Sequence, residues 1–143
     1  MKRIPAIVTA FASGLGGAIL LAAAWHAAGW TSPSREAGYP FTEYFMRCFG
    51  VGFVVAFALT MLLLGWRLRH AWAIGLGTVT PLPIAAVLEV IRDPTNHNLL
   101  PFEVVLYWIP TFLVSFGIAM IGSLAHRRMQ GANAATTHSA GGA

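Results

Sequence analysis

The chain has 143 residues, of which 57% are hydrophobic and only 10% are charged, whereas a soluble globular domain carries roughly 25% charged residues. A chain of this length has room for one domain, and so few charges cannot cover so much apolar surface against water. The composition therefore excludes a soluble enzyme, a disulfide-stapled secreted domain and a disordered regulator, and it predicts a protein embedded in lipid. The single cysteine, Cys48, excludes an internal disulfide and a CxxC metal site.

Four apolar segments are each long enough to cross a bilayer as a helix: residues 4–28, 45–66, 71–91 and 104–125. A membrane β-barrel would require short segments of alternating polarity, so we expect an all-α, integral membrane four-helix bundle over residues 1–129. The first segment follows Lys2 and Arg3 as in a signal peptide, but its apolar run exceeds the roughly 7–15 residues of a cleaved segment, which predicts a retained helix. Residues 130–143 are rich in Gly, Ala, Ser and Thr and predict a disordered cytoplasmic tail.

The basic residues predict the orientation of the helices. With the N-terminus inside, six basic residues fall on the cytoplasmic side and three on the outer side: Lys2, Arg3, Arg67, Arg69, Arg127 and Arg128 against Arg35, Arg47 and Arg92. The positive-inside rule then predicts that both termini are cytoplasmic. Eight of the nine basic residues are Arg, which favours a bacterial origin and hence the inner membrane. Because these residues flank apolar segments, the net charge of +4 does not indicate a nucleic-acid partner.

The densest polar stretch runs from residue 89 to residue 103, between the third and fourth apolar segments. Glu89 lies in the last predicted turn of a membrane helix, where an acid is costly and usually has a partner or a function. With Asp93 and His97 it forms the candidate catalytic group, suited to a proton, a metal or a lipid headgroup. The candidate ligands for a metal such as Zn, Mn or non-haem Fe are His97, Glu89, Asp93 and His26, although no His-x-x-x-His or Glu-x-x-His pair supports such a site.

A structural interpretation of the same residues stays open. Glu89 could form an ion pair with Arg92, three residues later, or with Arg47 at the outer start of the second helix. Asp93, which is followed by a proline, suits a helix N-cap, and Glu103 suits the first turn of the fourth helix. On this interpretation the segment caps and ties helices and carries no chemistry.

Helix-breaking and small residues predict how the helices pack. Pro81, Pro83 and Pro110 each remove a backbone hydrogen bond and are expected to kink the third and fourth helices. Small residues recur at four-residue spacing, which permits close packing within the bundle or in a homo-oligomer: Ala10, Ser13, Gly14, Gly17, Ala18, Gly75, Gly77, Gly117 and Gly122. The short segment 67–70 predicts a tight turn that pairs the second and third helices as an antiparallel hairpin.

The run from Asp93 to Glu103 resembles a loop of small bacterial multi-spanning membrane proteins, with the pattern D-P-T-x-H-N-L-x-P-x-E. The resemblance covers a short part of the chain and includes Glu89 on the preceding helix. It implies a bacterial membrane protein and attaches no activity.

These features predict a small accessory or scaffold protein of the bacterial inner membrane, without catalytic activity and without a bound cofactor. Its expected partners are the lipid bilayer and either a second copy of the chain or another membrane protein. The alternative is a membrane enzyme or a small transporter that uses the Glu89, Asp93 and His97 group at the outer face.

Overall fold

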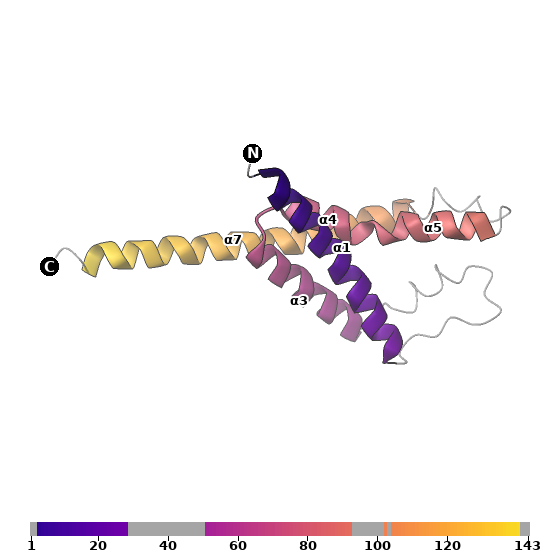
Figure 1. The fold of residues 1–143 in the computed structure, drawn as a ribbon. Helices are drawn as coiled ribbons and strands as arrows, with labels where there is room; N and C mark the ends of the chain where they lie inside the picture. The colour runs from indigo at the N-terminus through magenta and orange to yellow at the C-terminus, as the bar shows by residue number, and fades with distance from the viewer. Residues whose placement is uncertain (1–2, 29–50, 93–101, 103, 141–143) are drawn as a thin grey trace.

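A computed structural model describes residues 3–28, 51–92, 102 and 104–140. These residues form the helices α1 (Arg3–Ala27), α3 (Val51–Arg67), α4 (Ala71–Val79), α5 (Pro81–Arg92), the π-helix η2 (Val104–Trp108) and α7 (Ile109–Ala140) (Figure 1). Short turns join α3 to α4 and α4 to α5. The all-helical class predicted from the sequence is confirmed for the described residues.

Within the described ranges, three helical stretches are long and apolar enough to cross a membrane: Ile4–Ala27, Ala71–Leu88 and Val105–Ala132. Each of them falls on a segment that the sequence predicts to span. Helix α3 is also apolar but has 17 residues in the described range, and the predicted start of its segment, residues 45–50, lies outside the described residues. Large apolar side chains are exposed along these helices, as at Leu20 and Leu63, and such surfaces suit lipid better than water.

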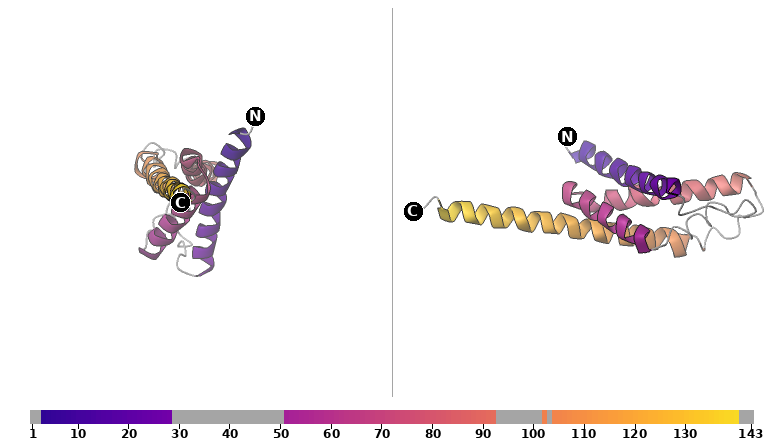
Figure 2. Two further views of the ribbon diagram at one scale, coloured as in Figure 1. Left: turned by 90° about the vertical axis from the view of Figure 1, so that its left-hand side faces the viewer. Right: turned by 90° about the horizontal axis from the view of Figure 1, so that it is seen from below.

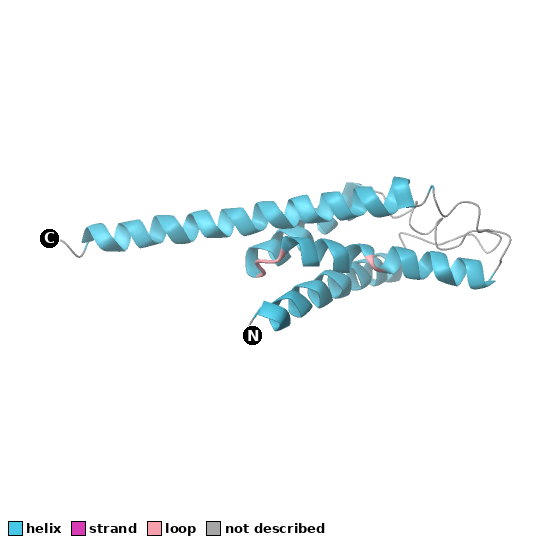
Figure 3. Ribbon diagram, turned by 90° about the horizontal axis from the view of Figure 1, so that it is seen from above, coloured by secondary structure: helices cyan, strands magenta, loops and turns pink. Residues whose placement is uncertain are grey.

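The helices alternate in direction along the molecule. Helix α1 and the α4–α5 stretch run from one end to the other, while α3 and α7 run back (Figure 1). The start of α1, the turn between α3 and α4, and the C-terminal part of α7 therefore lie toward one end (Figure 3). The end of α1, the start of α3, the end of α5 and η2 lie toward the opposite end.

Helices α1, α3, α4 and α7 each pack most extensively against a helix that is not their neighbour in sequence. Helix α1 packs against α4, and α3 packs against α7. Helix α4 also packs against α7, so that it lies between α1 and α7 (Figure 2). Helices α3 and α4 diverge from the turn that joins them and contact each other little. The predicted α3–α4 hairpin pairing is therefore wrong, because close contacts between more distant helices determine the packing.

The third predicted helix is divided at Thr80, directly before Pro81. Helix α4 ends at Val79 and α5 begins at Pro81. The Thr80 backbone N–H donates to the carbonyls of Leu76, at 3.2 Å, and Gly77, at 3.3 Å. In a regular helix the N–H of residue 81 would donate to the Gly77 carbonyl, but proline has no N–H. The Thr80 N–H donates to that carbonyl instead. Thr80 keeps helical backbone angles, with φ −54° and ψ −35°, and the interruption is local.

Pro110 is the second residue of α7 and follows the π-helix η2. A proline in a regular α-helix crowds the carbonyl four residues earlier, which here belongs to Leu106. Leu106 lies inside η2, where the wider π turn replaces the bonding pattern that the proline interrupts. Pro83, the third residue of α5, lies in a first turn, where a missing N–H leaves no intrahelical bond unmade.

The end of α7 differs from the expected disordered tail. This helix has 32 residues and continues to Ala140, a length of about 48 Å at the helical rise per residue. Its last part extends beyond the other helices (Figure 1). Alanine, the strongest helix former, recurs between residues 130 and 140, and no proline interrupts this stretch. We call residues 127–140 the C-terminal arm.

Candidate functional site

The polar segment singled out from the sequence is described only at its start. Glu89 belongs to α5, three residues before the last helical residue, Arg92, and for both residues the backbone alone is described. Other candidates in the predicted site lie outside the described residues: Arg47, Asp93, His97 and Glu103. The ion pair, the caps and the catalytic group at this segment therefore stay predictions.

His26, the fourth candidate metal ligand, lies in the last turn of α1 and is exposed. Helices α1 and α5 diverge toward the end of the molecule where His26 and Glu89 are located (Figure 1), and they contact each other little. Among the residues that the structure describes, no three His, Cys, Asp or Glu side chains come together as a metal site would require.

Thr78 is a buried polar residue at a point in the interior where α4 contacts α3. Thr78 is 4% exposed, and Met61 and Ile74 are fully buried. The Thr78 hydroxyl lies 2.8 Å from the Ile74 carbonyl oxygen and 3.3 Å from the Met61 sulfur. Its single proton can go to one acceptor at a time, and the carbonyl is the stronger one. The group ties α4 to α3 through a soft, polarisable contact.

The hydroxyl of Ser115, in α7, is fully enclosed and has no exposed surface. It donates to the Thr111 carbonyl and lies 3.3 Å from the Phe112 carbonyl oxygen. Such bonding to the preceding turn satisfies a hydroxyl inside a membrane helix without a partner on another helix. Each hydroxyl is thus bonded to a carbonyl of its own helix, and within the described core neither is paired with a base that would activate it.

Two glycines hold α1 and α4 at close distance. A Cβ on Gly14 would overlap the carbonyl of Ile74, and a Cβ on Gly77 would overlap the backbone of Phe11 and Leu15. The glycine of each helix thus faces the main chain of the other. Helices approach this closely only where side chains are missing, and the approach increases van der Waals contact between the backbones.

The same reciprocal arrangement joins α3 to α7. A Cβ on Gly65 would overlap the backbone of Ala119, and a Cβ on Gly122 would overlap the carbonyl of Leu62. Gly14, Gly77 and Gly122 belong to the small residues noted in the sequence, and their use is internal. Sequence reasoning missed Gly65. Its signal was available, because it is an isolated glycine in a helical run of large apolar residues, which often marks a packing contact.

Other small residues noted in the sequence take different positions. Ala10 is fully buried in the core, and a Cβ on Gly75 would come within 3.2 Å of the Phe112 and Phe116 side chains of α7. Near Gly117 the structure has nothing within 4 Å of an added Cβ. The four-residue spacing therefore identified a class of residue, while the actual contacts depend on which face each glycine occupies.

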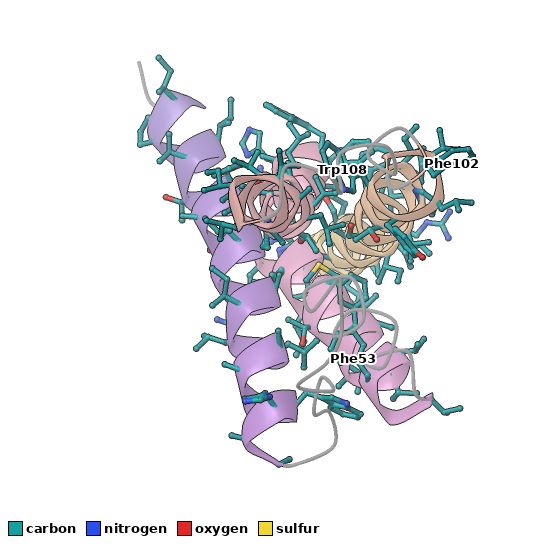
Figure 4. The ribbon with its side chains drawn as sticks, turned by 90° about the vertical axis from the view of Figure 1, so that its right-hand side faces the viewer. Phe53, Phe102 and Trp108 are labelled. Atoms are coloured by element: carbon teal, nitrogen blue, oxygen red, sulfur yellow. The ribbon has the colours of Figure 1, made fainter. Side chains whose placement is uncertain are left out.

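Aromatic rings connect α1 and α3 at the end opposite the α3–α4 turn. Trp25 and Phe53 meet edge to face with ring centroids 5.4 Å apart, and Phe53 stacks on Phe57 at 6.3 Å. Phe53 lies between α1 and α3, whereas Phe102 and Trp108 lie on the other side of this end (Figure 4). The two aromatic groups are thus separate, in keeping with the divergence of α1 from α5.

Comparison of the chain with protein-family models, with curated proteins and with solved structures found no match. The helix arrangement and the side-chain contacts are therefore the basis for assigning a role.

Proposed function

We propose that this chain is a small polytopic protein of the bacterial inner membrane that acts as a non-catalytic accessory or scaffold protein. Four spans, including one over residues 45–66, would form a bundle with both termini in the cytoplasm. The C-terminal arm and the outward helix faces would contact a partner membrane protein or a second copy of the chain.

The lengths of the helices support four spans. The three longest apolar stretches have 24, 18 and 28 residues, against the roughly 20 that a hydrocarbon core requires. The described part of α3 reaches about 26 Å at 1.5 Å per residue, and a helical continuation over residues 45–50 would bring it to the thickness of the core. The alternation of helix direction supports a common side for both termini (Figure 3), and the arginines at that end favour the cytoplasm.

The observation that carries the scaffold role is the way the interior is filled. The helices meet through reciprocal glycine–backbone contacts, and the enclosed hydroxyls of Thr78 and Ser115 are bonded to carbonyls of their own helices. Such an interior serves packing. The surfaces that remain available for a function are the outward faces and the C-terminal arm, whose described side chains at residues 127–132 are all exposed.

Site-specific photo-crosslinking in cells tests this role. A photoreactive residue in place of Ala132, in the arm, is expected to give one discrete adduct with a protein of defined mass. The matched control replaces Leu20, which is 71% exposed on α1 and is expected to give lipid adducts. Truncation after Gln130 should abolish the protein adduct while the protein remains in the membrane, and loss of the chain should lower the abundance of the crosslinked partner. If neither the arm nor the outward faces yield a protein adduct, the scaffold role is wrong.

A membrane enzyme or transporter is the second candidate, and one observation favours it. Glu89 directly follows the apolar span Ala71–Leu88, a position where an acid usually has a partner or a function. Elemental analysis of the purified protein beside His97→Ala tests its metal-dependent form: a near-stoichiometric metal that the variant loses supports this candidate. If no metal is present and Glu89→Gln leaves growth and protein level unchanged, this candidate is wrong.

A further inference from the structure

The C-terminal end of α3 packs against the middle of α7. The Trp66 and His126 rings meet at 65° with centroids 5.3 Å apart, and a Cβ on Gly122 would lie 3.0 Å from the Trp66 backbone nitrogen. His126 also lies 2.9 Å from the Gln130 side-chain nitrogen, one turn further along α7. These contacts fix the relative register of the two helices at this level.

Arginines come directly after Trp66 on α3 and directly after His126 on α7. We call these residues the basic end: Arg67, Arg69, Arg127 and Arg128, all of them exposed. Arg67 follows Trp66, and Arg127 follows His126, so the ring contact brings the two sequence positions to the same level. Arg67 is the last residue of α3, and its charge is favourable near the carbonyls that end a helix.

The basic end has no acid of its own to neutralise it. No Asp or Glu occurs in residues 1–28, 51–88 or 104–143, which include the helices that meet at this end of the molecule. The guanidinium groups cannot therefore form ion pairs with carboxylates of these segments. Four positive charges at one level of the molecule favour an anion from outside the chain.

Two tryptophans indicate the depth of the basic end in a bilayer. Trp66 lies one residue before Arg67, and Trp72, in the first turn of α4, is 46% exposed. Tryptophan is enriched at the level of the lipid headgroups, and long arginine side chains extend from the helix end toward that level. In a bilayer, this depth would place the arginines beside phosphate groups rather than in bulk solvent.

We propose that the basic end binds the headgroup of an anionic phospholipid, an inference that rests on the membrane location given under the proposed function. The planar guanidinium group donates two parallel, charge-assisted hydrogen bonds to a phosphate. A neutral side chain cannot provide this charge-assisted pair of bonds. A headgroup with a net negative charge leaves its phosphate available to more than one arginine. In a zwitterionic headgroup, the cation already balances the charge of the phosphate. A soluble polyanion is the alternative ligand that the experiment must separate from lipid.

The experiment measures lipid selectivity of the full-length protein in phosphatidylcholine vesicles. Spin-labelled phosphatidylglycerol or phosphatidylcholine is added as probe, and electron paramagnetic resonance gives the motionally restricted fraction of each. The unmodified protein is expected to prefer phosphatidylglycerol, and each contacting arginine to contribute a factor of about five. The double variants Arg67→Gln/Arg69→Gln and Arg127→Gln/Arg128→Gln should each lose a large part of this preference, and the quadruple variant should lose all of it.

Two controls keep the result interpretable. Arg35→Gln removes a charge outside the basic end and should leave the preference unchanged. The four Arg→Lys replacements retain the charge and should keep a reduced preference, which separates charge from hydrogen-bonding geometry. Equal restriction of both probes by the unmodified protein overturns the inference, as does a preference that inorganic polyphosphate abolishes while helicity is unchanged. Extraction of the protein by alkaline carbonate would instead contradict the membrane location itself, so the two failures can be told apart.

Discussion

The α4–α5 stretch and α1 are both apolar enough to span a membrane, yet they occupy different places in the molecule. Of the span Ala71–Leu88, 44% is buried within the protein, against 11% of an 18-residue window within Ile4–Ala27. Helix α4 carries small residues toward two neighbours, with Gly77 against α1 and Gly75 against α7. Helix α1 places Gly14 against the α4 backbone, but toward α3 its Gly17 meets side chains only, at 3.4 Å or more. The difference shows that apolarity makes a helix suitable for the membrane, whereas extensive packing on two sides makes it central.

The largest expected effect comes from filling the α1–α4 contact. Gly77→Leu would drive a side chain into the backbone of Phe11 and Leu15, which cannot move aside as a flexible side chain can. We expect loss of the folded protein, measured as the monodisperse fraction on size-exclusion chromatography in detergent. Gly16→Leu is the matched control on α1, because nothing lies within 4 Å of a Cβ there. Equal behaviour of the two variants would contradict the central place of α4.

A cavity at the centre should cost less than a backbone clash. Met61→Ala removes a fully buried side chain, and large-to-alanine changes of this kind lower the free energy of unfolding by about 2–5 kcal/mol. Leu63→Ala, at a position that is 65% exposed on the same helix, should cost under about 1 kcal/mol because the lipid refills the space. Denaturant titration followed by circular dichroism compares the two. A Leu63 effect as large as that of Met61 would mean that this face of α3 is covered by protein.

The buried hydroxyl should contribute modestly. Thr78→Val keeps the side-chain volume and removes the donor to the Ile74 carbonyl of the same helix. We expect a loss of no more than about 0.6 kcal/mol, the average for side-chain hydrogen bonds between membrane helices. The control is Thr9→Val. The Thr9 hydroxyl donates to the Pro5 carbonyl in the same way but at an exposed site, so its removal should lower the free energy of unfolding by less. The same titration measures both. A loss of several kcal/mol at Thr78 would indicate that the hydroxyl has a role beyond its own helix.

The smallest effect is expected where a glycine faces a side chain instead of a backbone. A Cβ on Gly52 would meet the far edge of the Trp25 ring at 3.0 Å, and the ring can move by a few tenths of an ångström. Gly52→Ala should therefore change stability by less than about 0.5 kcal/mol. Gly65→Ala, where the obstacle is the backbone of Ala119, should cost about 1–3 kcal/mol or more. Thermal unfolding of the pair ranks the two contacts, and the reverse order would contradict the backbone argument.

Much of the helical content could be predicted from the chain alone. The span Ile4–Ala27 falls on the predicted 4–28, and Pro81 coincides with the division between α4 and α5. Apolar length and proline chemistry are local properties, which explains this agreement. For residues 130–140 the two differ: a Gly, Ala, Ser and Thr composition has no apolar pattern and predicts a disordered tail, whereas the structure continues α7 to Ala140, in line with the intrinsic helix preference of alanine.

The sequence by itself determined the kind of molecule: apolar helices of membrane-spanning length, with arginines at their ends and proline interruptions. Only the tertiary structure decided the partners, pairing α1 with α4 and α3 with α7 instead of joining α3 and α4 as a hairpin. The physical reason is that hydropathy is summed along one segment, whereas a close helix contact needs a glycine on one helix opposite the backbone of another. Gly65 and Ala119 are far apart in the chain, and only folding brings them together.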